Sequence, residues 1–262
     1  MPQNVANLRE VSNRDGLFFF ERSDCDLPFY RGVPIFLGTG RWLIVLASVA
    51  LAFTALIQAQ QMFNTGVATF IPSLLFVLIP LVTLGLVGGW QAPSALFRPL
   101  RRRDFLLIIG FLVLNWIVTI IVGLLIVGMF QGLANPAVER VAGASGADRA
   151  IYFGATAIQL LGEEILTILP FLAFLTLLNG ALARKTALAL AALGAAVIFA
   201  LVHLPTYQWN VPQALVGLVP IRLVLLLPFI ITRNIWVSTG VHILNDWAIF
   251  TMTMIGGPDA AG

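Results

Sequence analysis

Six ionisable side chains lie inside long apolar stretches of this 262-residue chain, where ionised groups are costly. An ionised side chain at the centre of a bilayer costs roughly 2.5–3.5 kcal/mol on insertion scales, so such residues are candidates for function. The set includes both histidines of the chain, and a carboxylate beside an imidazole in a poorly hydrated pocket can act as a general base toward water. The six residues are Glu163, Glu164, His203, Arg222, His242 and Asp246.

Two kinds of hydrolytic site could be built from these groups. In the first, a glutamate and a histidine activate water, while the second histidine and a carboxamide or carboxyl group stabilise the oxyanion of a tetrahedral intermediate. In the second, a divalent metal such as zinc is bound by carboxylate and imidazole ligands. The sequence leaves zinc and no cofactor equally open. The candidate metal ligands are Glu163, His203, His242 and Asp246.

Helical spacing groups these residues with other polar side chains. Glu163 shares a helix face with polar neighbours, whereas the same steps from Glu164 reach apolar residues. A count from the hairpin turns puts Glu163 and His203 at a similar height and His242 nearer the cytoplasmic end. Polar stripes in lipid must face each other or an aqueous cavity. The two stripes are Thr156, Gln159, Glu163 and Thr167, and Ser238, Thr239, His242, Asn245 and Asp246.

The composition predicts the elements that must position these residues. Hydrophobic residues make up 59% of the chain and charged residues only 10%, far from the usage of soluble domains. A run of about 20 apolar residues is long enough to cross a bilayer as a helix. Seven such runs predict an all-α bundle of about seven transmembrane helices: residues 42–60, 67–88, 105–128, 150–178, 187–204, 211–231 and 235–255.

Basic residues gather on one side of the predicted bundle. They precede the first run and lie between runs two and three, four and five, and six and seven, so we expect a cytoplasmic amino terminus and a carboxyl terminus outside. This placement accounts for the net charge of +3, which therefore does not indicate a nucleic-acid partner. We expect a cytoplasmic or interfacial segment 1–41, a scaffold 42–148 and a catalytic part 149–262. Phe29 and Tyr30 are expected on the membrane surface or in a disordered tail.

Three short motifs lie in order within residues 150–250, at Glu163–Ile168, Phe199–His203 and His242–Asp246. They resemble the motifs E-E-x-x-x-R, F-x-x-x-H and H-x-x-x-N or D of the CAAX prenyl endopeptidase and bacteriocin-processing enzymes, often called the CPBP or Abi family. Motifs of other membrane proteases, H-E-x-x-H, G-x-S-x-G and G-x-G-D, do not occur in the sequence.

The resemblance implies an intramembrane endopeptidase that hydrolyses an amide bond of a membrane-associated peptide or protein. By this resemblance, Glu163 would activate water together with His203. His242 and Asp246 would stabilise the oxyanion or complete a metal site, and Glu164 would be a supporting acid. Further supporting residues in the motifs are Phe199 and Asn245.

Two positions depart from the family pattern. Ile168 stands where the motif has arginine, which leaves two buried acids without the positive charge that would balance them. We expect Arg222, which is surrounded by leucines, to supply that charge from the sixth run, although a structural ion pair with Asp246 is an equal alternative. Asp246 replaces the commoner asparagine, which favours metal binding.

Two other functions are compatible with the sequence. The missing arginine allows a member of the family that has lost proteolysis and serves as a membrane scaffold or partner-binding protein. A proton-coupled transporter would also carry acids and histidines in its spans, but we find no internal repeat with corresponding broken helices. A prenylated CAAX tail, a bacteriocin leader and a membrane-anchored regulator are all compatible substrates, and the need for a partner subunit is open. Near-exclusive use of arginine over lysine suggests a bacterial plasma membrane.

Overall fold

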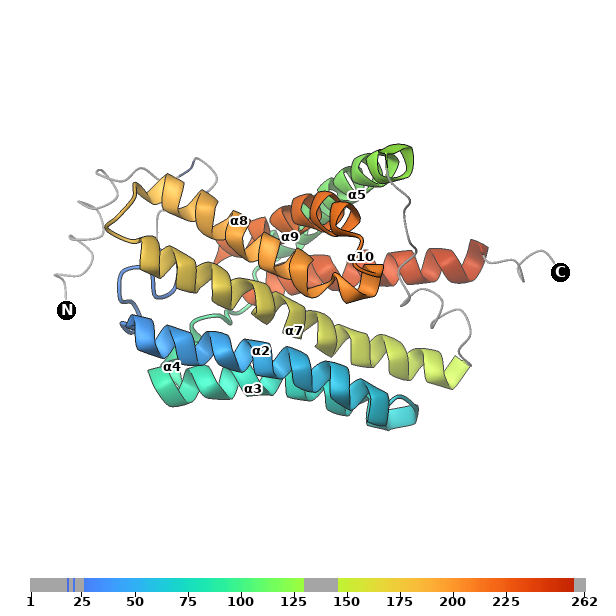
Figure 1. Cartoon of the computed structure of the whole chain (residues 1–262), viewed down its shortest axis with the longest axis horizontal. Helices are drawn as coiled ribbons and strands as arrows, with labels where there is room; N and C mark the ends of the chain where they lie inside the picture. Colours follow the sequence, from blue (N-terminus) through green and yellow to red (C-terminus); the bar gives the residue numbers. More distant parts are fainter. Residues whose placement is uncertain (1–17, 19–20, 22–25, 130–145, 257–262) are drawn as a thin grey trace.

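The computed structural model describes Phe18, Glu21, residues 26–129 and residues 146–256 of the chain (Figure 1). Short helical turns connect the longer helices: η1 (Gly66–Thr69), α4 (Gln91–Ser94), η2 (Pro205–Tyr207) and the π-helical turn η3 (Gln213–Leu218). The main helices are α2 (Thr39–Met62), α3 (Phe70–Gly88), α5 (Arg102–Met129), α7 (Gly146–Leu178), α8 (Arg184–Val202), α9 (Val219–Thr232) and α10 (Ile235–Gly256).

The predicted polytopic helical membrane bundle is confirmed. In the described part of the chain, six helical segments are long and apolar enough to cross a membrane, and they coincide with the first six predicted runs. The last run forms α10, a helix of 22 residues. It is not one of those six because its polar stripe, which includes His242 and Asp246, lowers its hydropathy.

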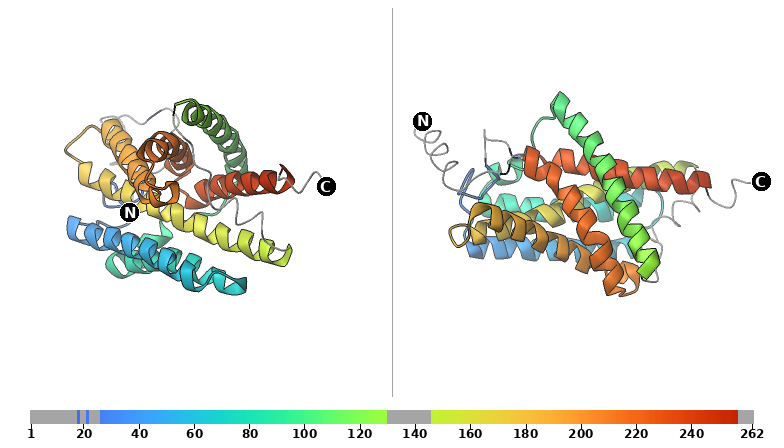
Figure 2. Two further views of the ribbon diagram at one scale, coloured as in Figure 1. Left: turned by 45° about the vertical axis from the view of Figure 1, so that its right-hand side comes forward. Right: turned by 90° about the horizontal axis from the view of Figure 1, so that it is seen from above.

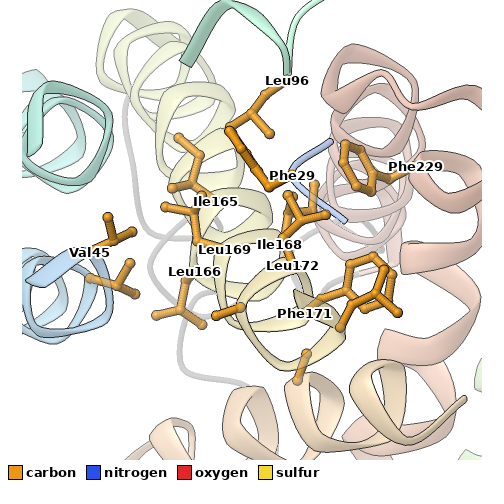
Figure 3. Packing of buried hydrophobic residues seen from close by; sticks show 14 of the residues in the cluster. Phe29, Val45, Leu96, Ile165, Leu166, Ile168, Leu169, Phe171, Leu172 and Phe229 are labelled. Atoms are coloured by element: carbon orange, nitrogen blue, oxygen red, sulfur yellow. The ribbon is translucent and has the colours of Figure 1, made fainter. Parts of the chain in front are cut away.

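Helix α7 occupies the centre of the bundle. It packs against α2 and α3 on one side and against α8, α9 and α10 on the other (Figures 1 and 2). Its residues 164–173 are all buried, and they form much of the hydrophobic cluster drawn in Figure 3. In contrast, α5 packs mainly against α9, η3 and α10 and exposes most of its apolar side chains, as expected of a helix in contact with lipid. The glutamates are therefore carried by the helix that touches most of the others.

Close helix contacts fix the position of α7. A Cβ atom added at Gly162 would lie 2.4 Å from Cδ1 of Phe76 on α3, which is closer than real side chains approach. Glycine is therefore required at this crossing, one residue before the glutamate pair. A small residue at a helix interface allows two membrane helices to pack closely.

The residues before α2 that the structure describes are packed into the protein. Phe29 and Tyr30, expected on the membrane surface or in a disordered tail, are instead buried, with exposed fractions of 0% and 2%. Phe29 packs edge-on against Trp42 at the start of α2. These aromatic rings join the central hydrophobic cluster because burial there removes a large apolar surface from water.

A buried ion cluster ties this leader to two later turns. The carboxylate of Glu21 accepts two hydrogen bonds of 2.6 Å from Arg184, at the start of α8, and one of 3.2 Å from Arg233, between α9 and α10. Asp26 accepts a further bond of 2.8 Å from Arg184. All three side chains of the Glu21 pairs are 3% exposed or less, so each charge depends on its partners for stabilisation.

The turn between α9 and α10 is also buried, whereas residues 179–183, which join α7 to α8, are exposed. Asn234 exchanges two hydrogen bonds with the backbone of Arg98, and the amide of Ile235 donates to the carbonyl of Leu96. Helix α10 therefore begins inside the protein and not at its surface. His242 on α10 is in direct contact with Glu164, so this offset corrects the residue count that placed His242 nearer the cytoplasmic end.

Candidate active site

The two adjacent glutamates of α7 occupy different environments. Glu164 is completely buried, while the side chain of Glu163 is 13% exposed. Glu163 accepts a hydrogen bond of 3.2 Å from Gln159, one turn earlier on the same helix. This agrees with the polar face expected around Glu163 and the apolar face expected around Glu164.

Arg222 of α9 neutralises the buried glutamate. Its Nη2 atom donates to Oε1 of Glu164 at 2.6 Å and to the backbone carbonyl of Glu163 at 3.3 Å. Its guanidinium carbon lies 4.4 Å from the ring centroid of Phe199 on α8. Arg222 is itself 0% exposed, and the ion pair together with the aromatic ring stabilises its buried charge. The positive charge expected beside the glutamates thus comes from Arg222, and its ion pair is with Glu164 and not with Asp246.

His242 of α10 lies between three carboxylates. Its Nδ1 atom is 3.0 Å from Oε1 of Glu164, and its Nε2 atom is 3.8 Å from Oε2 of Glu163 and 3.9 Å from Oδ1 of Asp246. A carboxylate only accepts hydrogen bonds, so Nδ1 carries a proton and donates it to Glu164. The contact of 3.3 Å between Nδ1 and Nη1 of Arg222 is then a contact between two donors and not a hydrogen bond. Nε2 faces the remaining two carboxylates.

Asp246 is held by a chain of amides. Asn245 donates from Nδ2 to Oδ1 of Asp246 at 3.0 Å, and Asn115 of α5 donates to Oδ1 of Asn245 at 2.9 Å. Asn115 is completely buried on a helix most of whose apolar side chains are exposed. It was missed because a single amide in a long apolar run carries no motif, although its cost in lipid was a usable signal.

His203 reaches this cluster through Phe199. It caps the carboxyl end of α8, where Pro205 begins the turn η2. Its Nδ1 lies 2.7 Å from the carbonyl oxygen of Phe199, and the two rings stack with centroids 4.3 Å apart. The guanidinium of Arg222 also lies over the ring of Phe199. The structure thus brings Glu163, Glu164 and His242 into direct proximity, and it connects His203 to Arg222 through the ring of Phe199.

Ile168 lies one helical turn after Glu164 and packs among apolar side chains. It is 0% exposed and belongs to the central hydrophobic cluster, where Figure 3 shows it among Phe29, Leu96 and Leu172. An arginine at this position would replace an apolar side chain of this cluster by a charged one. The departure from the family motif at Ile168 is therefore matched by the positive charge that Arg222 brings from another helix.

Tyr207 of η2 is a further polar residue, and its pKa depends on these acids. Burial, together with the negative charges of Asp246 and Glu163, raises the pKa of Tyr207 to about 12. Its hydroxyl group therefore remains protonated at physiological pH and can donate a hydrogen bond. Sequence reasoning missed Tyr207 because it lies in a connection and outside the three motifs.

The residues that the structure describes include all four expected metal ligands. Among them, no group of three or more histidine, cysteine, aspartate or glutamate side chains is arranged to hold a metal ion. The carboxylates nearest His242 are instead engaged with Arg222, Gln159 and Asn245. Zinc binding by Glu163, His203, His242 and Asp246 therefore stays a prediction for chemical analysis.

The helices and the buried acid–imidazole cluster define the class: a multi-pass membrane protein with a polar site enclosed by its helices. Residues 146–248 match the model of the Rce1-like family, described as type II CAAX prenyl endopeptidase Rce1-like. The match confirms the resemblance found in the three motifs and supports a protease at the level of the family. Comparison with curated proteins found no match, and comparison with solved structures found none.

Proposed function

We propose that this chain is an intramembrane endopeptidase in which Glu163 activates water beside His242. The observation that supports this most directly is the geometry at Nε2 of His242, which lies 3.8 Å from Glu163 and 3.9 Å from Asp246. Both separations exceed a direct hydrogen bond and are short enough for one oxygen atom to bridge. Water, which can donate to the carboxylate and accept from Nε2, would occupy this bridging position.

The two glutamates take different roles in this proposal. Glu164 already accepts hydrogen bonds from Arg222 and His242, so it orients the imidazole and is not the base. Glu163 is the more exposed of the two and accepts a bond from the neutral amide of Gln159. It is therefore the carboxylate that can take a proton from water. This assignment agrees with the role that the family motif gives to Glu163.

The hydrolytic step uses these groups in order. As the water oxygen bonds to the carbonyl carbon, its proton passes to Glu163, and the carbonyl oxygen becomes an oxyanion. In its protonated form, His242 donates from Nε2 to this oxyanion while Nδ1 remains bound to Glu164. Glu163 then gives its proton to the leaving nitrogen as the carbon–nitrogen bond breaks. The products are a new carboxyl and a new amino terminus.

His203 has a supporting place in the proposal. Its Nδ1 donates to the carbonyl of Phe199, which leaves Nε2 available for the substrate or for the water. The substrate is a peptide or protein that reaches the site within the membrane. This follows from the enclosure of the site by the helices and from the endopeptidase description of the family.

The proposal is tested by comparing peptide termini in cells that carry wild type, Glu163→Gln or His203→Ala. We expect new termini with wild type, a loss of at least about 10²-fold with Glu163→Gln, and a smaller loss with His203→Ala. Asp148→Asn makes the same carboxylate-to-amide change at the start of α7, 15 residues from Glu163 in sequence, and serves as the matched control. Metal analysis of the purified protein separates zinc-assisted from acid–base chemistry.

Equal amounts of correctly folded Glu163→Gln protein in the membrane are needed for this comparison. If Glu163→Gln produces the same termini as wild type, Glu163 is not the base. If no terminus depends on the wild-type protein, the scaffold function replaces the peptidase function.

A further inference from the structure

A chain of two side-chain hydrogen bonds leads from α2 to Glu163. Nε2 of Gln60 donates to Oε1 of Gln159 at 2.9 Å, and Nε2 of Gln159 donates to Oε1 of Glu163 at 3.2 Å. Gln60 and Gln159 are 99 residues apart in sequence but meet where α2 packs against α7. The contact thus links the scaffold helices with the helix that carries the candidate base.

The location of Gln60 distinguishes it from its neighbours. Gln58 and Gln61 on the same helix are exposed, whereas Gln60 is half-buried against α7. An amide in a membrane-spanning helix is stabilised by a partner on a neighbouring helix, because lipid offers none. The contact with Gln159 satisfies this requirement.

The direction of the two bonds determines what Glu163 encounters. An amide has a donor end and an acceptor end, and it can rotate so that either end faces a neighbour. Because Gln60 donates to the oxygen of Gln159, the NH₂ group of Gln159 is turned toward Glu163. If the amide rotated, its oxygen would face a carboxylate, and the two acceptors would repel each other.

We propose that Gln60 of α2 is a positioning residue for Glu163 and acts through Gln159. Gln60 fixes the orientation of the Gln159 amide, which in turn holds Oε1 of the carboxylate and leaves Oε2 directed toward His242. A helix outside the family match thereby contributes to the site. The inference rests on the proposed role of Glu163 as the base.

Infrared spectroscopy of the purified protein in lipid nanodiscs tests the positioning without any substrate. Subtracting the spectrum of Glu163→Gln isolates the carboxylate stretching band of Glu163, whose frequency depends on its hydrogen bonds. Methionine is close to glutamine in size and lacks the amide, so we use Gln159→Met and Gln60→Met. We expect Gln159→Met to shift the band and Gln60→Met to shift it in part. Gln61→Met, the matched control on α2, should leave it unchanged.

The double variant distinguishes a relay from two independent effects. If Gln60 acts only through Gln159, adding Gln60→Met to Gln159→Met produces no further shift. Peptide processing should fall about two- to tenfold in Gln60→Met, as expected for one weakened hydrogen bond, and should not fall further in the double variant than in Gln159→Met. Thermal unfolding in nanodiscs provides the check that all variants remain folded.

The outcomes separate this inference from the proposed function. A band that moves in Gln159→Met but stays at the wild-type position in Gln60→Met would rule out the role of Gln60. Additive shifts in the double variant would also overturn the relay. If the infrared shifts occur as expected but Glu163→Gln still processes peptides, the positioning stands and the catalytic role of Glu163 fails.

Discussion

At the scale of single residues, the ion pair between Arg222 and Glu164 gives the two adjacent glutamates different environments, and the proposed mechanism gives them different functions. Glu164 is occupied by Arg222 and His242, which leaves Glu163 as the glutamate that faces the bridging position beside Asp246. Both members of the ion pair are fully buried, so each would be costly without the other. We therefore expect the effects of removing the two charges on the free energy of unfolding to be strongly coupled.

The coupling can be measured with a double-mutant cycle. Arg222→Met should lower the free energy of unfolding by about 3–5 kcal/mol, because it leaves the Glu164 carboxylate buried without a cation. Combining it with Glu164→Gln should recover part of this loss, since the unpaired charge is then removed. The free energy of unfolding in mixed micelles is the measurement. Additive losses in the double variant would show that the two charges do not depend on each other.

The family arginine gives a second test at the same scale. Ile168→Arg restores the motif but introduces a charge into the hydrophobic cluster, so we expect lower stability than wild type and no gain in processing. Folded protein yield and the midpoint of thermal unfolding provide the check. A variant that is as stable as wild type would mean that position 168 can reach the charges of the site.

The sequence predicted these residues unevenly, for physical reasons. The glutamates, His242 and Asp246 were found because an ionisable group in an apolar run is costly and therefore conspicuous. The identity of the partner of Arg222 could not be decided, because Glu164 and Asp246 are both acids and only the packing of α9 chooses between them. Asn115 and Gln60 were missed because neutral amides in lipid are less unusual than charges.

At the scale of helices, close packing of α7 against α3 sets the position of the glutamates. Gly162 precedes Glu163 directly and leaves room for the ring of Phe76. Any atom added here must displace α3, α7 or the ring.

The ends of the helices were predicted to within a few residues, since apolar runs define them. The start of α10 inside the protein could not be predicted from the sequence, because it depends on the buried turn held by Asn234 and the backbone of Arg98.

Gly162→Ala is the direct test of this helix contact. It should reduce the free energy of unfolding by about 1–3 kcal/mol through overpacking and should lower peptide processing by displacing Glu163. Gly110→Ala on α5 is the control, because nothing lies within 4 Å of its added Cβ. Replacing Phe76 by leucine in the Gly162→Ala protein should restore part of the stability. Equal stability of the two alanine variants would contradict the packing argument.

At the scale of the whole molecule, the described part of the amino-terminal leader, Phe18, Glu21 and residues 26–38, is a structural part of the bundle. Glu21 connects the start of α8 with the turn before α10, so it joins the helix that His203 caps to the helix that carries His242. The sequence suggested a surface segment or a tail, because its mixed polarity resembles both. Burial of Phe29 and Tyr30 shows that the aromatic residues of a polar leader can belong to the core.

Glu21→Gln tests the contribution of this ion cluster. The variant leaves Arg184 and Arg233 buried with one negative partner fewer, and we expect a loss of about 3–5 kcal/mol in the free energy of unfolding. Arg103→Gln is the control, because Arg103 lies 4.0 Å from Asp104 with a side chain that is 52% exposed, and it should cost less than about 1 kcal/mol. Equal stability of the two variants would show that the leader does not hold the turns together.

The most direct test of the central claim is hydrolysis by the purified protein in lipid nanodiscs. Membrane peptides from cells that carry Glu163→Gln serve as substrates, and the reaction is run in water enriched in oxygen-18. Wild-type protein should produce new carboxyl termini that contain oxygen from the solvent, and Glu163→Gln protein should produce none above background. New termini formed equally well by Glu163→Gln, or no labelled termini with wild type, would contradict the assignment of Glu163 as the residue that activates water.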